Sequence, residues 1–187
     1  REKEKLNIKG IFTLIHAAYE VSVIAKTCNL PTLEPHIILV SDEKILHKKI
    51  LEKNGLPIAK YKEIKSINDL EAGLKQFHNS AILKTTDSYG GKGTQKIDKD
   101  TNLIEKWNDV LQVLSSGTII LEEKLDGEFI DLQGFMYNGR FYRGGESSVS
   151  FTDYLEGIGQ INPIETFHIS PSIQSKSIID EAYELFE

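Results

Sequence analysis

Apolar residues recur at two spacings along this chain, and each spacing predicts a different kind of element. In residues 11–28 they stand three or four positions apart, which is typical of a helix that packs on one face. Asn29, Leu30 and Pro31 end that helix. The stretch up to residue 40 contains two prolines and favours a connection between domains.

Capping residues predict further helices. Asp42 is positioned to cap a helix that runs through Lys53, and Gly55 supplies its left-handed stop. Ser66 and Asp69 form a capping pair at the start of the next helix. The remaining helices are expected at residues 103–114 and 173–186.

Short strands are predicted where apolar or β-branched residues alternate or cluster. They are expected at residues 58–64, 81–85, 95–97, 118–121, 128–137 and 140–149. Asn138-Gly139 between the last two is a strong hairpin signal. The span 150–172 is predicted to be irregular. Because hairpins imply antiparallel pairing, the element order predicts an α+β fold or a mixed α/β layout, not an uninterrupted βαβ series.

Composition and charge exclude some classes of partner. The 187 residues are 40% hydrophobic with a net charge of −6, which is ordinary for one large or two small domains. The basic residues form no stripe with interleaved aromatics, so no nucleic acid is expected. No apolar run is long enough to span a bilayer, so no membrane is expected. Cys28 is the only cysteine, which suits a reducing cytoplasm. Because the chain begins at Arg1, we expect it to be a piece of a longer protein.

A glycine-rich loop between two predicted strands is the first candidate site. Residues 84–94 read Lys-Thr-Thr-Asp-Ser-Tyr-Gly-Gly-Lys-Gly-Thr. Three glycines within four positions let backbone N–H groups approach phosphate oxygens without a Cβ in the way. The loop is not a P-loop, because Thr86 and Gly93 stand where Gly and Ser or Thr are required. No helix follows, so it is not a dinucleotide fingerprint either.

A mobile lid over a triphosphate is one use of such a strand–loop–strand segment. Taken alone, the loop is also explained as a flexible hairpin tip. Lys84 favours the lid, because it ends an otherwise apolar strand directly before the loop.

An acidic segment after a predicted buried strand is the second candidate site. Residues 119–129 read Ile-Ile-Leu-Glu-Glu-Lys-Leu-Asp-Gly-Glu-Phe. Adenine offers an exocyclic amine and ribose offers hydroxyls, and carboxylates at a strand end suit both. On its own, the segment is also explained as a solvated acidic turn.

Together these segments resemble the ATP-grasp superfamily. Residues 84–93 are similar to its Lys-Pro-x-Asp-x-x-Gly-x-x-Gly loop, and residues 120–129 resemble its Glu-Glu hinge segment. Residues 42–57 match the segment that opens the domain, and residues 17–31 look like the end of the domain before it. The four segments occur in the family's order and cover nearly the whole chain. They favour the carbamoyl-phosphate-synthetase-like and amino-acid-ligase-like branch.

The resemblance implies which residues bind the phosphates of ATP. Lys44 and Lys84 would hold the α- and β-phosphates. The loop would fold over the phosphates with Ser88, Gly90, Gly91, Lys92, Gly93 and Thr94.

The resemblance also implies residues for the adenosine part. Glu122 would accept a hydrogen bond from the adenine amine, and the backbone around Lys124 and Leu125 would read the edge of the ring. Glu128 would take the ribose hydroxyls, although it follows Gly127 one residue earlier than the family pattern has it. Two further departures are Thr85 in place of Pro and Asn29 in place of Gly.

The resemblance further implies an ATP-grasp fold in which two subdomains grip ATP. Residues 1–40 would be the C-terminal part of a preceding α/β domain, and residues 41–187 the ATP-grasp domain. ATP and Mg²⁺ are the implied cofactors. We expect the metal ligands beyond Glu187, no metal ligand within this chain, and no activity from the chain alone. The sequence assigns no catalytic residue.

Three functions remain open at this point. The first is an ATP-dependent ligase that joins a small-molecule carboxylate to an amine or ammonia through an acylphosphate. The second is a biotin-dependent or bicarbonate-activating carboxylase, and the third is a nucleotide-binding module without chemistry. A homodimer is left open in each case. The residues after Glu187 would discriminate the third function from the others.

Overall fold

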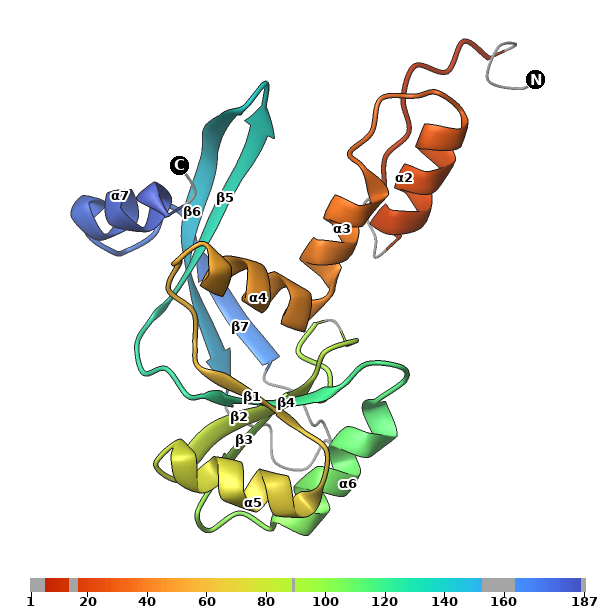
Figure 1. The fold of residues 1–187 in the computed structure, drawn as a ribbon. Coiled ribbons are helices and arrows are strands. Elements are labelled where there is room, and N and C mark those ends of the chain that lie inside the picture. The colour runs from red at the N-terminus through yellow and green to blue at the C-terminus, as the bar shows by residue number, and fades with distance from the viewer. Residues whose placement is uncertain (1–5, 14–16, 89, 153–163, 186–187) are drawn as a thin grey trace. The chain divides into compact units, whose positions relative to one another are not determined.

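The computed structural model describes residues 6–13, 17–88, 90–152 and 164–185. Its contacts divide the chain into two compact units, Arg1–Ile58 and Ala59–Glu187. The elements are labelled in Figure 1. The expected boundary between domains, at residues 40 and 41, stays a prediction.

Within its described residues, the first unit contains the helices α2 (Ala18–Thr27), α3 (Pro35–Asp42) and α4 (Lys44–Lys53). The helix expected over residues 11–28 begins only at Ala18. Residues 11–13 have no regular structure, and residues 14–16 lie outside the described residues.

Helix α3 corrects the prediction for residues 32–40, which were expected to connect two domains. Pro35 stands at the first turn, where its fixed φ and missing N–H suit a helix start. Asp42 is the last residue of α3, so its expected role as a cap for α4 is wrong. The N-cap of α4 is Glu43, which makes no side-chain capping hydrogen bond.

Helices α2 and α4 both end at a left-handed residue. Asn29 has φ 50° and Gly55 has φ 70°. Asn29 therefore adopts the conformation for which glycine is preferred, and Gly55 supplies the predicted stop. In each case the following N–H bonds to a carbonyl five residues back, Leu30 to Ala25 at 2.8 Å and Leu56 to Leu51 at 3.0 Å.

The second unit begins with a four-stranded antiparallel sheet, called sheet A here. Its strands are β1 (Tyr61–Ile64), β2 (Ser80–Thr85), β3 (Gln95–Asp98) and β4 (Ile119–Glu123), in the order β1-β4-β2-β3. Helices α5 (Ile67–Gln76) and α6 (Leu103–Val113) cover one face of it (Figure 1). The strands and helices predicted for this region are confirmed.

Alternation along the strands separates the two faces of sheet A. The face under the helices is apolar, with a core of Ile64, Leu70, Leu74, Ala81, Leu83, Ile97, Val110, Ile119 and Leu121. Ser66 and Asn102 cap the two helices by accepting the N–H of Asp69 and Glu105. The opposite face of β2 and β4 carries Ile82, Lys84, Ile120 and Glu122.

A three-stranded antiparallel sheet, called sheet B here, follows in the same unit. It contains β5 (Phe129–Tyr137), β6 (Arg140–Thr152) and β7 (Ile164–Ile169) in that order. Asn138 and Gly139 have φ 49° and 74°, which confirms the predicted hairpin. Strand β7 lies within a span expected to be irregular, so that prediction is wrong there. Residues 153–163 of the same span lie outside the described residues.

Helix α7 (Lys176–Glu184) is fixed to sheet B through Tyr183. The Tyr183 hydroxyl donates to the Gly145 carbonyl at 2.6 Å, and its ring lies 4.5 Å below the Arg143 guanidinium. Arg143 also forms an ion pair with Asp180 at 2.7 Å. Across the described ranges, no helix is long and apolar enough to cross a bilayer.

Candidate functional site

Two of the predicted site residues meet on the face of sheet A opposite the helices. Ile82 pairs with Glu122 across the β2–β4 ladder, and Lys84 pairs with Ile120. Lys84 and Glu122 are therefore diagonal neighbours on one face. The Lys84 Nζ lies 2.7 Å from the Glu122 Oε2, and the side chains are 21% and 8% exposed. This ion pair is almost withdrawn from water.

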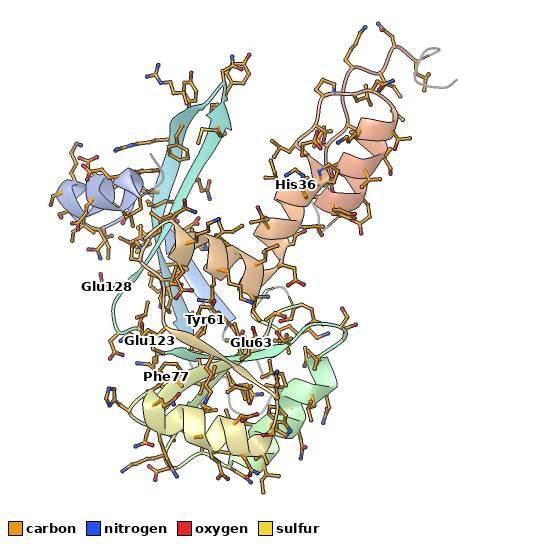
Figure 2. The ribbon with its side chains drawn as sticks, in the orientation of Figure 1. His36, Tyr61, Glu63, Phe77, Glu123 and Glu128 are labelled. Carbon is orange, nitrogen blue, oxygen red and sulfur yellow. The ribbon has the colours of Figure 1, made fainter. Side chains whose placement is uncertain are left out.

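Residues of the outer strands surround this pair. In the ladders, Tyr61 and Glu63 of β1 stand opposite Glu122 and Ile120, and Lys96 of β3 stands opposite Ile82. Figure 2 labels Tyr61 and Glu63 on β1. The face thus combines lysines and carboxylates around apolar side chains, which suits a ligand with an uncharged ring and an anionic end.

The loop between β2 and β3 has a firmly held first part, Thr86–Ser88, called the loop base here. The Asp87 Oδ2 accepts the backbone N–H groups of Ser115, Ser116 and Gly117 at 2.9, 2.7 and 2.8 Å. Thr86 adds two bonds to Thr118, one through its N–H and one through its hydroxyl, both at 2.9 Å. The turn before β4 therefore holds the start of the loop.

Burial raises the pKa of Asp87, but the hydrogen bonds from Ser116, Gly117 and Ser115 lower it by more. The net pKa lies below the ordinary Asp value of 3.8. Gly117 is required for this contact, because a Cβ there would stand 2.6 Å from the Thr86 hydroxyl and 2.8 Å from the Asp87 Cβ.

The second part of the loop, residues 90–93, is called the loop tip here. Gly90, Gly91 and Gly93 have φ 61°, 73° and 73°, which other residues rarely adopt. A Cβ at Gly90 would meet nothing within 4 Å, whereas one at Gly93 would press on Val113 at 3.2 Å. Lys92 is exposed. Ser88 joins the loop base to β2, since it accepts the Thr85 hydroxyl at 2.6 Å.

The segment after β4 carries the residues expected to contact adenosine. Lys124 pairs with Asp126, and Leu125 is 66% exposed. Glu128 accepts a hydrogen bond from the Gln174 side chain, so the carboxylate expected for ribose already has a partner. Figure 2 shows Glu123 at the end of β4 and Glu128 before β5.

Lys44 is the first residue of α4 and belongs to the first unit. Its expected contact with the phosphates stays a prediction. Within the ranges that the structure describes, no group of three His, Cys, Asp or Glu side chains could hold a metal ion.

Sequence reasoning missed Asp87 and Gly117 as residues of this site. Asp87 stood within the loop motif without a role, and its partners lie 28–30 positions further along the chain. The Ser-Ser-Gly run at 115–117 was the available signal, because small residues in a turn expose backbone N–H groups.

Comparison with known proteins decides the family. The family model of the phosphoribosylglycinamide synthetase ATP-grasp (A) domain matches residues 42–147, more than half of the chain. The chain belongs to this ATP-grasp family. This confirms the α+β fold class. It also confirms the resemblance to the ATP-grasp superfamily, which rested on Lys84, the loop and the acidic segment.

One curated relative of this ATP-grasp chain is the bifunctional purine synthesis protein purC/E of Dictyostelium discoideum. The two are 28% identical over 96 residues, which are 51% of this chain and 10% of the relative. The chain thus matches about a tenth of that protein's length.

Solved structures agree on the ATP-grasp fold. A biotin carboxylase–β-γ-ATP complex from Campylobacter jejuni matches with a TM-score of 0.79 at 15% identity, over 98% of this chain and 43% of that chain. The N5-carboxyaminoimidazole synthetase of Staphylococcus aureus, complexed with ADP, matches with a TM-score of 0.69 at 17% identity, over 90% and 42%. At these identities the matches show the fold alone.

Proposed function

We propose that this chain is the ATP-binding part of a ligase that joins a small-molecule carboxylate to an amine or ammonia. One observation carries the proposal: Lys84 and Glu122 meet at 2.7 Å on the face of sheet A opposite the helices, and Lys84 stands directly before the glycine-rich loop. An ammonium suits phosphate oxygens, and a carboxylate at a strand end suits the adenine amine. Family membership over residues 42–147 supports the same reading.

Each site residue takes one part of the nucleotide in this proposal. Lys84 contacts the α- and β-phosphates together with backbone N–H groups of the loop tip. Lys44 is proposed to bind the same phosphates. Glu122 accepts the adenine amine, and the main chain at Lys124 and Leu125 reads the ring edge. Glu128 is proposed to bind the ribose hydroxyls. To do so it gives up the hydrogen bond that it accepts from the Gln174 side-chain amide.

ATP supplies the phosphoryl group that turns a carboxylate into an acylphosphate, which the amine then attacks. The chain positions the reacting groups and stabilises developing charge, and these two effects lower the barrier most in such chemistry. Lys84 neutralises phosphate charge from a fixed strand, and the loop tip excludes water by folding over the phosphates. Among the described residues no group of His, Cys, Asp or Glu side chains could hold Mg²⁺. We propose that the ligands of Mg²⁺ lie beyond Glu187.

Activation of bicarbonate is the second candidate. The name of the Campylobacter jejuni structure, whose fold this chain shares, suggests this alternative. The names of the relatives from Staphylococcus aureus and Dictyostelium discoideum add purine synthesis intermediates as candidate substrates. We propose a homodimer as the assembly to test first.

The test measures release of ADP and phosphate by the complete protein with a panel of carboxylates and amines, including bicarbonate. The proposal expects release that depends on both substrates and is lost in Lys84→Ala. Release with bicarbonate alone would favour the second candidate. Tight ATP binding without release under any condition would leave only a nucleotide-binding module.

A further inference from the structure

The hydrogen bond between Glu128 and Gln174 joins two segments that lie 46 positions apart in the sequence. Glu128, labelled in Figure 2, stands in the connection from β4 to β5, and Gln174 stands in the connection from β7 to α7. The Gln174 side-chain amide donates to the Glu128 Oε2. A ribose hydroxyl would also meet the carboxylate as an uncharged donor. The amide therefore occupies Glu128 in the way that ribose is proposed to do.

Residues 172–174, called the anchor segment here, hold the backbone of Gln174 in place. The Ser148 hydroxyl oxygen on β6 accepts the Ile173 N–H at 3.1 Å and lies 2.9 Å from the Ser172 hydroxyl. The Ser172 hydroxyl oxygen accepts the Gln174 N–H at 3.1 Å. Because Ser148 is only 6% exposed, the anchor segment is tied to a buried residue of sheet B.

An anchored donor competes well, because it has little conformational freedom left to lose when it meets its acceptor. A nucleotide has to displace the Gln174 amide before its ribose can donate to Glu128. What ATP gains at the ribose is then only the difference between two hydrogen bonds. A nucleotide without sugar hydroxyls leaves the amide in place and forgoes only that difference.

We infer that the Gln174 amide is an internal competitor of ribose for Glu128, which weakens ATP binding and narrows the preference for ribose over a sugar without hydroxyls. Gln174 acts through Glu128, as a positioning residue that need not touch the nucleotide. The inference rests on the proposed function, because it assumes that Glu128 binds the ribose of ATP.

The test compares ATP with 2′,3′-dideoxy-ATP by calorimetric titration of the complete protein. Gln174→Met removes the amide donor and keeps a side chain of similar length. We expect ATP to bind about fivefold tighter to this variant than to the native protein, because ribose no longer has to displace a hydrogen bond. The affinity for dideoxy-ATP should change by less than about twofold, so the preference for ribose should rise.

Gln133→Met is the matched control. Gln133 lies on β5, and its side-chain amide also donates to a carboxylate, the Asp131 Oδ2, at 3.0 Å. The substitution therefore removes the same kind of donor from the same sheet, in a hydrogen bond that does not involve Glu128. We expect the affinities for both nucleotides to change by less than about twofold.

A double-mutant cycle with Glu128→Ala separates competition from a general effect on the fold. Without the carboxylate there is nothing to compete for, so adding Gln174→Met should leave the ATP affinity within about twofold of Glu128→Ala alone. Tightening of the same size in both backgrounds, or equal tightening of both nucleotides, would overturn the inference.

Gln174→Ala also removes the donor and serves as a second variant if the methionine disturbs folding. It should show the same selective tightening of ATP. Unchanged or weaker ATP binding in a folded Gln174→Met or Gln174→Ala variant overturns the inference while the proposed function stands. If the native protein binds no ATP at all, the proposed function fails and the inference falls with it.

Discussion

The loop base and the loop tip are adjacent in sequence but are built in opposite ways. The base is held to the turn before β4 by hydrogen bonds that include three to Asp87 and two through Thr86. The tip carries three glycines at positive φ. A rigid base fixes the direction of Lys84, whereas a glycine tip can change shape around a ligand. One loop can thus combine a positioned cation with a movable cover.

The largest expected effect is a loss of stability when the contacts of the loop base are disturbed. Gly117→Ala should destabilise the protein by about 1–3 kcal/mol, because its Cβ would lie within 3 Å of Thr86 and Asp87. Gly90→Ala is the matched control at the tip, where space is open and only the positive φ opposes alanine, at about 1–2 kcal/mol. Urea unfolding of both variants measures the difference. A greater loss at Gly90 would reverse the comparison.

Asp87→Asn should have the next largest effect. The three N–H groups then donate to a neutral acceptor or face an amide NH₂. The free energy of unfolding should therefore fall by about 1–2 kcal/mol. Since the base positions Lys84, ATP should also bind several-fold more weakly. Unfolding and ATP titration of the same variant measure both. Unchanged stability would mean that the loop is held by Thr86 alone.

The pH dependence isolates the charge of Asp87. Its pKa in the folded protein lies below 3.8, so its contribution is fully present above the unfolded pKa and is lost as pH falls through the folded value. Other carboxylates with lowered pKa values titrate in the same range, among them Asp69, Asp98 and Asp180. The difference in stability between the native protein and Asp87→Asn is therefore the quantity to follow. It should shrink as pH drops below about 4, and a constant difference would contradict the assignment.

The smallest effect concerns motion of the tip. Backbone amides of Gly90 and Gly91 should exchange with solvent faster than the amide of Thr86, which is bonded to the Thr118 carbonyl at 2.9 Å. ATP should slow exchange at the tip and leave Thr86 nearly unchanged. Mass-spectrometric exchange with and without ATP measures this. Equal protection of the tip in both states would contradict a movable cover.

Sheet A could be predicted almost completely from the sequence, because its signals are local. Ser66 with Asp69 indicated the start of α5, and the short apolar run at residues 81–85 indicated β2. The glycines at 90, 91 and 93 announced the hairpin loop. Each of these signals lies within the element that it predicts.

The errors arose where local signals compete or where contacts are distant. Asp42 is a good capping residue, but α3 extends to it from Pro35, so the residue ends one helix and does not cap the next. Strand β7 is six residues long and lies between Pro163 and Pro171 in the sequence. The two prolines are turn signals, and they led to the prediction of an irregular segment. The pairing of Lys84 with Glu122 depends on the register of β2 against β4, which no single segment encodes.

The most direct test of the account compares ATP binding by Lys84→Ala and Lys92→Ala in the complete protein. Lys84 is fixed on a strand and partly buried, so a charge-assisted contact there is worth about 1.5–3 kcal/mol. Lys92 is exposed at the tip, where an ion pair is worth about 0–1 kcal/mol. Lys84→Ala in a Glu122→Gln background, compared with Glu122→Gln alone, controls for the loss of the ion pair between the two side chains. We predict that Lys84→Ala weakens ATP binding about tenfold more than Lys92→Ala. Equal losses, or a larger loss at Lys92, would show that the tip holds the phosphates and that Lys84 does not.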